Sequence, residues 1–142
     1  EKALQSLNVN SIFKEWKEMS FIENVADCHI GLAPRDLDCG HSNAAPANKL
    51  VNYQGLGLAC IASKIKSFED FKKNTHGLIY LCESREDWSN ALSKIINQKD
   101  EIIDQREKAH KFTKKNFGKK NLSSLWLDIL NPFIEKLTSD TK

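Results

Sequence analysis

The sequence lacks the long apolar segments that membrane-spanning proteins need. No run of about 18 apolar residues occurs in it, so it predicts no transmembrane helix. The opening residues EKALQSLNVN have neither the basic start nor the apolar stretch of a signal peptide, and the first residue is not Met. We therefore expect a processed chain or part of a longer one.

Cysteine is sparse, and its spacing argues against disulfides and metal sites. The cysteines are Cys28, Cys39, Cys60 and Cys82, and all but Cys39 lie in apolar, strand-like runs, where cysteine behaves as a small buried hydrophobe. The length and spacing do not suggest a disulfide framework, so we expect a reduced, cytosolic protein. Neither CxxC nor HxxxH occurs. Cys39 and His41 in DLDCGH are a candidate pair of metal ligands, but a solvated loop is the better interpretation, and we predict no metal and no cofactor.

Acidic residues are missing from one basic segment near the C-terminus. The chain has 142 residues and a net charge of only +2, ordinary values for a single globular domain with a core. Residues 111–120, KFTKKNFGKK, nevertheless hold five lysines and no acid. The commonest explanation is a solvated helix end; peripheral contact with a membrane surface and binding to nucleic acid are the sharper alternatives. We rank nucleic acid last, because only Phe112 and Phe117 could stack on bases there.

Helical and strand-like segments alternate through most of the chain. Short apolar runs predict strands at 9–16, 28–33, 58–62 and 77–82. Helices are predicted at 20–27, 48–54, 67–74 and 84–98, after a helix end at 1–7, with N-caps at Ser20, Ser67 and Ser84. Acidic residues three positions after Ser20 and Ser84 complete two predicted capping boxes. The alternation is typical of an α/β, Rossmann-like parallel sheet flanked by helices, and the continuous apolar run 28–33 predicts a strand covered on both faces.

The C-terminal part of the chain is predicted to be helical throughout. Apolar residues recur there at helical spacing, and they are Leu122, Leu125, Trp126, Ile129, Leu130, Phe133, Ile134 and Leu137. This stripe is larger than a small sheet edge can cover. We therefore expect Trp126, Ile129, Phe133 and Leu137 to be exposed, or to be buried only against another copy of the chain.

A ligand site is predicted at the carboxyl ends of the strands, where open α/β sheets bind ligands. The longest loop there is 34–47, and a helix follows it from about Asn48. Helix N-termini carry free N–H groups that suit phosphate, and Ser42, Asn43 and Lys49 lie close to this one in the sequence. The alternative is that Asn48 is only an N-cap and Lys49 a solvated first-turn residue. From these residues alone, both interpretations stay open.

Several segments in a fixed order carry a resemblance to a known family. They are ADCHIGLAP, the polar loop, NKLVNYQGLGLACIAS, GLIYLC and REDWSNALSKII. This order resembles the C-terminal, nucleotide-sugar-binding half of GT-B glycosyltransferases of the family-4 type, from about Val9 to Leu137. The resemblance implies a partial Rossmann-like donor-binding domain over 1–120. It also implies an amphipathic helix over 121–142 that packs on an N-terminal domain missing from this chain.

The resemblance also implies an activity. A sugar would be transferred from a nucleotide-sugar donor to a glycan or lipid-linked acceptor, as in polysaccharide biosynthesis, with retention of configuration and without a metal. The protein would be cytoplasmic, with the inner membrane surface as a possible peripheral contact. The implied nucleotide-sugar-binding residues are Ser42, Asn43, Asn48, Lys49 and Asn52.

The sequence departs from the family pattern at two positions of the site. Asn52 stands where the family has a glutamate that holds the ribose hydroxyls, and Ala44 stands where the commoner pattern has a glutamate facing the sugar. Gly57, in contrast, matches the family glycine between helix and strand. No residue is a convincing general base, and this chain alone is expected to be inactive. A catalytically inactive, glycosyltransferase-like binding or scaffold protein is therefore the alternative.

Overall fold

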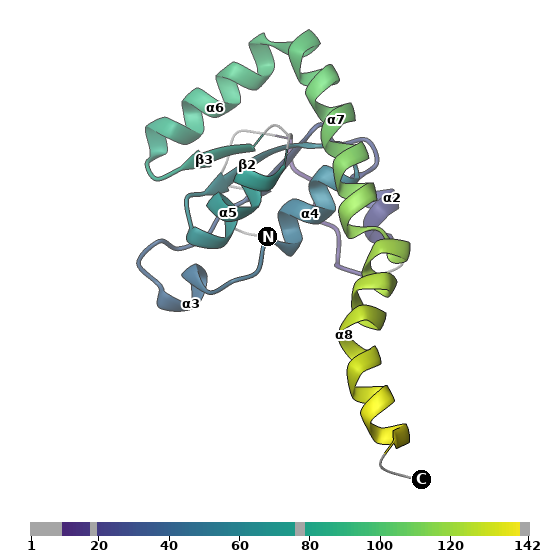
Figure 1. Ribbon diagram of the computed structural model, residues 1–142. Coiled ribbons are helices and arrows are strands. Elements are labelled where there is room, and N and C mark those ends of the chain that lie inside the picture. Colours follow the sequence, from purple (N-terminus) through teal and green to yellow (C-terminus); the bar gives the residue numbers. More distant parts are fainter. Residues whose placement is uncertain (1–9, 18–19, 76–78, 140–142) are drawn as a thin grey trace.

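The computed structural model describes residues 10–17, 20–75 and 79–139. Its elements, in chain order, are α2 (Phe21–Val25), β1 (Ile30–Ala33), α3 (Gly40–Asn43), α4 (Asn48–Gly55), β2 (Ala59–Ser63), α5 (Lys66–Asn74), β3 (Ile79–Cys82), α6 (Arg85–Asn97), α7 (Lys99–Phe117) and α8 (Lys119–Ser139) (Figure 1). The helix end predicted at 1–7 lies outside the described residues.

The three strands form one parallel sheet in the order β1-β2-β3. In its register Ile30 lies opposite Ala59, and Cys60 lies opposite Ile79. β2 is buried along its whole length because it is the central strand and has helices over both faces. Parallel strands in one sheet need crossover connections, and the helices between them supply these. The strands predicted from apolar runs at 28–33, 58–62 and 77–82 are confirmed, with slightly different ends.

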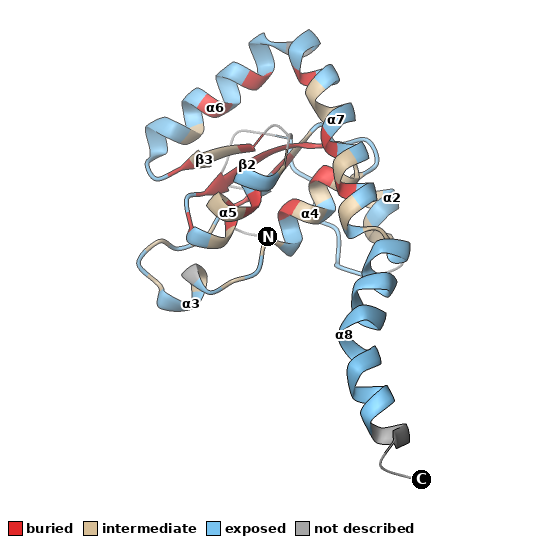
Figure 2. Ribbon diagram, viewed as in Figure 1, coloured by how far each residue is buried: buried red, intermediate tan, exposed pale blue. Residues whose placement is uncertain are grey.

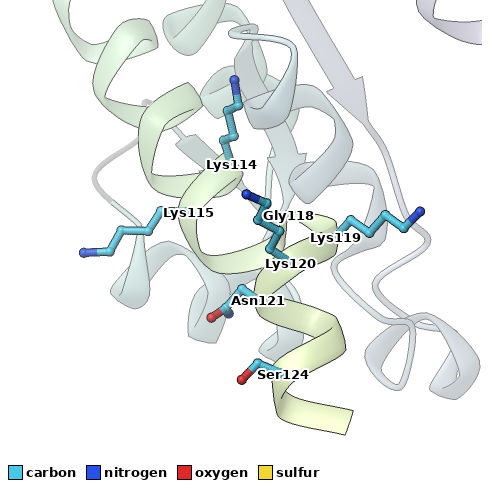
Figure 3. Close-up of a pocket in the computed structure, with 7 residues that line it drawn as sticks. All are labelled: Lys114, Lys115, Gly118, Lys119, Lys120, Asn121 and Ser124. Atoms are coloured by element: carbon cyan, nitrogen blue, oxygen red, sulfur yellow. The ribbon is translucent and has the colours of Figure 1, made fainter. Parts of the chain in front are cut away.

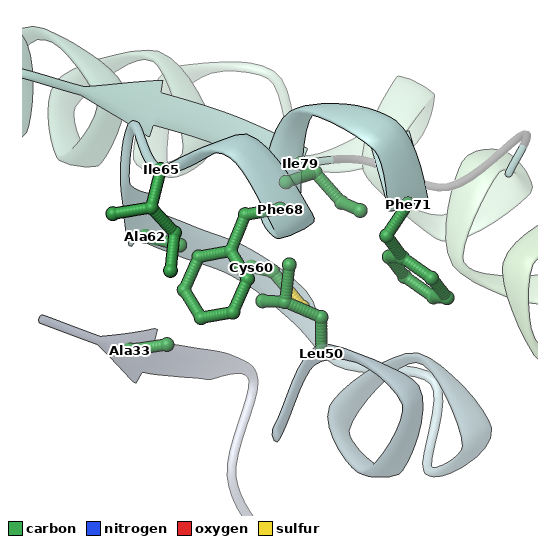
Figure 4. Packing of buried hydrophobic residues seen from close by; sticks show 8 residues of the cluster. All are labelled: Ala33, Leu50, Cys60, Ala62, Ile65, Phe68, Phe71 and Ile79. Atoms are coloured by element: carbon green, nitrogen blue, oxygen red, sulfur yellow. The ribbon is translucent and has the colours of Figure 1, made fainter. Parts of the chain in front are cut away.

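Helices cover the sheet on two sides (Figures 1 and 2). On one side, α4 and α5 close a cluster of buried residues, which are Ala33, Leu50, Cys60, Ala62, Ile65, Phe68, Phe71 and Ile79 (Figure 4). On the other side, α6 and the first turns of α7 close a second cluster, which is Ala59, Ile61, Cys82, Ala91, Ile95 and Ile102. The chain is therefore an α/β protein with a small parallel sheet between helical layers, as the alternation of segments predicts.

One predicted capping box is confirmed and one is wrong. At the start of α6 the backbone N–H of Asp87 donates to Ser84 Oγ at 3.1 Å, and the N–H of Ser84 donates to Asp87 Oδ2 at 2.9 Å. Ser20 precedes α2, but it forms no cap: its hydroxyl donates to the carbonyl of Lys17 and accepts from the Asn24 amide.

The N-cap predicted at Ser67 is also wrong, and so is the alternative that Asn48 is only an N-cap. Ser67 lies inside α5, because Ile65 occupies the N-cap position, and its hydroxyl donates to the Ala45 carbonyl at 2.6 Å. Asn48 lies inside the first turn of α4, because Ala47 occupies the N-cap position.

The strand predicted at 9–16 is wrong over its described residues, because 10–16 form no helix or strand. Its side chains are exposed, with Trp16 at 72%. A strand needs a neighbour to accept its hydrogen bonds, and none of the described strands pairs with this segment. The prediction that helices cover the strand 28–33 on both faces is also wrong. Leu32 is 48% exposed because α6 packs over β2 and β3 and leaves this side of β1 open.

The C-terminal helices form an elbow at Gly118. α7 packs along α4, whereas α8 extends away from the body (Figure 1). Trp126, Ile129 and Phe133 are 61%, 55% and 65% exposed, which confirms the prediction for these three, while the side chain of Leu137 lies outside the description. Among the described helices, none is both long enough and apolar enough to cross a bilayer.

Candidate functional site at the carboxyl edge of the sheet

Serine hydroxyls form hydrogen bonds with the backbone of the loop 34–47 near both of its ends. The backbone N–H of Arg35 donates to Ser63 Oγ at 2.7 Å, and Ser63 Oγ donates back to the Arg35 carbonyl at 2.9 Å. Near the other end, Ser67 holds the Ala45 carbonyl. Ser63 is the last residue of β2 and only 4% exposed, so the loop starts from a rigid point at the carboxyl edge.

The predicted site residues lie along this loop and the helix that follows it. Ser42 is half-buried in the single turn α3, and its backbone N–H donates to the Cys39 carbonyl. Asn43 ends the same turn, and its side chain is outside the description. Asn48 and Lys49 are exposed in the first turn of α4, and Asn52 is exposed one turn later.

Three of these residues share the outer face of α4. At 100° per residue, Asn48, Lys49 and Asn52 fall within about 100° of the helix circumference. Leu50 and Gln54, which are fully buried, lie on the opposite, sheet-facing side. The helix thus presents a short polar strip of two amides and one ammonium group, beginning at the end of the clamped loop.

Asn52 additionally borders a cavity beside α4. This cavity has a volume of about 400 Å³ and lies between α2, α4 and α7, with Phe21, Val51 and Phe117 among its apolar lining residues. Ser42, Asn48 and Lys49 do not line it. The structure therefore brings Asn48, Lys49 and Asn52 onto one helix face, but it does not gather all the predicted residues around this cavity.

Arg35 and Lys49, in and next to the loop 34–47, are free of carboxylates among the described residues, whereas Lys64 and Lys66 are paired. Lys64 pairs with Glu83 at 3.0 Å, and that hydrogen bond raises the pKa of Lys64; Lys66 pairs with Asp70 at 3.0 Å. In the described part of the chain, no carboxylate oxygen lies within 4.0 Å of the charged groups of Arg35 or Lys49. The buried Nε of Arg35 also has no hydrogen-bond partner there. Arg35 and Lys49 are thus the unpaired positive charges that adjoin the clamped loop.

The residues 56–58, between α4 and β2, form a sharp turn. Gly57 has φ +72°, a left-handed conformation that glycine adopts without strain and that commonly ends a helix. The Gln54 side chain is fully buried, and its Nε2 donates to the Leu58 carbonyl at 3.2 Å. These contacts join the C-terminus of α4 and the start of β2 into one unit.

Sequence reasoning missed the residues that hold this unit in place. Arg106 Nε of α7 donates to the Gly57 carbonyl, and His110 Nδ1 lies 2.5 Å from the Gly55 carbonyl. These contacts cap the C-terminus of α4 from residues that are distant in sequence, so no local pattern indicates them. Arg35 and Ser63 were missed as well, although their positions at the ends of β1 and β2 are the signal that could have found them.

The described residues of this region offer no set of metal ligands. Across the described residues, no group of three or more histidine, cysteine or acidic side chains is arranged to hold a metal ion. The cysteines Cys28, Cys39, Cys60 and Cys82 are all free thiols. What the edge offers is a clamped loop, exposed amides and two cations, which together can bind a polar, anionic ligand.

No family model, curated protein or solved structure matches this chain significantly.

Proposed function

We propose that this chain is the nucleotide-sugar-binding part of a GT-B-type glycosyltransferase that transfers a sugar to a glycan or lipid-linked acceptor. The observation that carries the proposal is the loop 34–47, clamped by Ser63 at the carboxyl edge and leading into the polar outer face of α4. Ligands of parallel α/β sheets bind at this edge. The ordered segments that resemble the family supply the identity of the ligand.

In this proposal Arg35 and Lys49 bind the diphosphate of the donor. Both are near the clamped loop, and both are free of carboxylate partners among the described residues. The loop residues Ser42 and Asn43 are proposed to contact the phosphates and the sugar. Because Arg can bind phosphate with two parallel N–H groups, it orients the donor more strictly than a single ammonium group does.

The amides of α4 recognise the neutral part of the donor. Asn48 and Asn52 are exposed and can hydrogen-bond sugar or ribose hydroxyls. An amide accepts from a hydroxyl without the charge assistance of a carboxylate, so the bond from Asn52 is weaker than that of the family's glutamate. This substitution, with Ala44 at the other glutamate position, favours the second candidate function, which is donor binding without sugar transfer.

Calorimetric titration of the chain with UDP-hexoses and GDP-hexoses tests the proposal. We expect saturable binding of one nucleotide class. Loss of a charge-assisted phosphate contact in Lys49→Ala or Arg35→Gln costs about 1.5–3 kcal/mol, or roughly ten- to a hundredfold in Kd. Lys94→Ala, on α6 over the Tyr80 ring, is the matched control and keeps the wild-type Kd.

Two further outcomes are informative. Binding by the chain with no transfer, even after a separately expressed acceptor-binding domain is added, would favour the inactive binding protein. No binding of either nucleotide class, or equal binding by wild type and both site variants, would overturn the proposed site.

A further inference from the structure

The cavity of about 400 Å³ beside α4 is bordered by helices from three distant parts of the sequence, which are α2, α4 and α7 (Figure 1). Small-molecule sites in proteins have volumes of roughly 300–1,000 Å³. Of the residues that line the cavity, Asn52 alone also belongs to the proposed donor site. The cavity is therefore a candidate site for a different ligand, and its walls indicate the chemical class of that ligand.

Apolar side chains make up much of the wall. They belong to or adjoin the three helices, and they are Phe21, Ile22, Val51, Leu56 and Phe117. The Phe117 ring packs against the buried Phe71 ring with centroids 5.8 Å apart, so the core holds it in place. Phe117 is nevertheless 39% exposed, which leaves part of its ring for a ligand. Because aromatic rings favour offset or tilted contacts with one another, a flat aromatic group suits this wall.

One face of α7 supplies polar groups to the wall. His110, Thr113 and Lys114 line the cavity, and with Phe117 they recur at helical spacing. Thr113 is only 4% exposed, and its hydroxyl has no hydrogen-bond partner among the residues that the structure describes. A buried hydroxyl in this state is uncommon and costs free energy, which a ligand that accepts its hydrogen bond recovers.

The charge at the cavity favours an anion. Lys114 lines it, and no acidic residue is among the lining residues. Within the described parts of the chain, no carboxylate oxygen lies within 4.0 Å of the Lys114 ammonium group. Figure 3 shows the Lys114 side chain extending in a different direction from those of Lys115 and Lys119, and neither of these lysines lines the cavity. A ligand with a single negative charge fits this arrangement.

We propose that this cavity binds a small aromatic carboxylate, at a site separate from the donor site. The aromatic ring of the ligand lies against Phe117 and the apolar side chains from α2 and α4. Its carboxylate accepts hydrogen bonds from the Lys114 ammonium group and the Thr113 hydroxyl, which are neighbours on α7 and suit the two carboxylate oxygens. Since no residue of α8 lines the cavity, the site does not require an uncovered α8.

Titration of the full 142-residue chain with 2-naphthoate, followed by calorimetry and by NMR shifts of the backbone amides, tests this site. The matched probes are 2-naphthamide, which is neutral, and 2-naphthylmethylamine, which is cationic. We expect saturable binding of the carboxylate, with the largest shifts at the amides of Val51, Thr113 and Phe117. The neutral amide lacks the charge-assisted hydrogen bond and should bind roughly ten- to a hundredfold more weakly. The cationic amine should bind more weakly than either.

Two variants separate the contacts to the carboxylate. Lys114→Gln should raise the Kd for naphthoate roughly tenfold and leave the Kd for the neutral amide unchanged. Thr113→Val keeps the shape of the side chain and should raise the Kd for naphthoate about two- to tenfold. Its urea midpoint should stay at or above that of wild type, because the variant removes a buried hydroxyl that lacks a partner in the described structure. Lys115→Gln, which changes an exposed lysine of α7 outside the cavity, is the matched control and should keep the wild-type Kd.

Lys49→Ala distinguishes this site from the donor site. It should leave naphthoate binding unchanged whatever it does to nucleotide-sugar binding, so either proposal can fail without the other. Displacement of naphthoate by UDP or GDP would show that the cavity belongs to the donor site and would overturn the proposal. Absence of saturable binding, equal affinity for carboxylate and amide, or equal loss in Lys115→Gln would overturn it as well. So would shifts confined to α8, which would place the probe on that helix and not in the cavity.

Discussion

The ring of Tyr53 in α4 lies directly over Gly31 in β1, so close that a Cβ at residue 31 would overlap it. The same tyrosine donates from its hydroxyl to the Leu32 carbonyl at 3.3 Å. One aromatic side chain thus packs the site helix α4 against the edge strand β1. Burial of that ring raises the pKa of Tyr53.

Gly31→Ala should therefore destabilise the fold. The added methyl group must displace the Tyr53 ring, and overpacking of this kind costs about 1–3 kcal/mol of unfolding free energy. Urea denaturation measures the change. In a Tyr53→Ala background the same substitution should cost little, because the ring is gone. Gly40→Ala is the control, since nothing lies within 4 Å of a Cβ there, and a comparable loss in that variant would contradict the explanation.

Ser63→Ala should loosen the loop 34–47. It removes both hydrogen bonds to the Arg35 backbone and leaves a partly buried N–H without its partner, at a cost of about 1–3 kcal/mol. Hydrogen exchange of the Arg35 amide should become much faster, while amides of α6 keep their protection. If the Arg35 amide exchanges at the wild-type rate, the loop is held by something other than Ser63.

Gly57→Ala should weaken the connection between α4 and β2. A side chain at φ +72° costs about 1–2 kcal/mol, whereas Gly57→Asn should cost less because asparagine tolerates this conformation. Nothing lies within 4 Å of a Cβ at this position, so the loss would come from the backbone and not from a clash. Equal stability of Ala and Asn variants in urea would contradict the conformational explanation.

The capping box of α6 should make stability depend on pH in the acid range. Hydrogen bonds from the backbone N–H groups of Ser84 and Glu83 lower the pKa of Asp87. A carboxyl group whose pKa is lower in the folded than in the unfolded chain stabilises the fold above the unfolded value, about 3.9. That contribution disappears as the pH falls through the folded value. Wild type should therefore be more stable than Asp87→Asn at pH 7 but not well below pH 4, and a difference independent of pH would refute the assignment.

Thiol reactivity should follow burial. Desolvation raises the pKa of Cys60 to about 12, against the opposing hydrogen bond from Gln54, whereas Cys28 is exposed. Near pH 8 only about one in ten thousand Cys60 thiols would be ionised. Iodoacetamide followed by mass spectrometry should modify Cys28 first and Cys60 last, and denaturant should abolish the order. Early modification of Cys60 in the folded chain would contradict its position in the core.

Local patterns predict the parts of this fold that depend on near neighbours in sequence. The apolar runs identify all three observed strands, and the Ser84 and Asp87 pair identifies the start of α6, because both partners of that cap lie within one turn. The period of apolar residues also predicts α8. The exposure of Trp126 and Phe133 follows from the same argument, since the predicted stripe is larger than the small sheet that could cover it.

Contacts between distant residues decided the rest. Ser67 lies inside α5 and not at its N-cap, and its hydroxyl donates to the Ala45 carbonyl, which only folding brings near. A strand at 10–16 would need a neighbouring strand that the described chain does not provide. The sequence by itself determined the three strands of the sheet and the start of α6, because their signals lie among near neighbours in the chain. Only the tertiary structure decided that Ser63 clamps Arg35 and that α7 caps α4, because those partners are far apart in the chain.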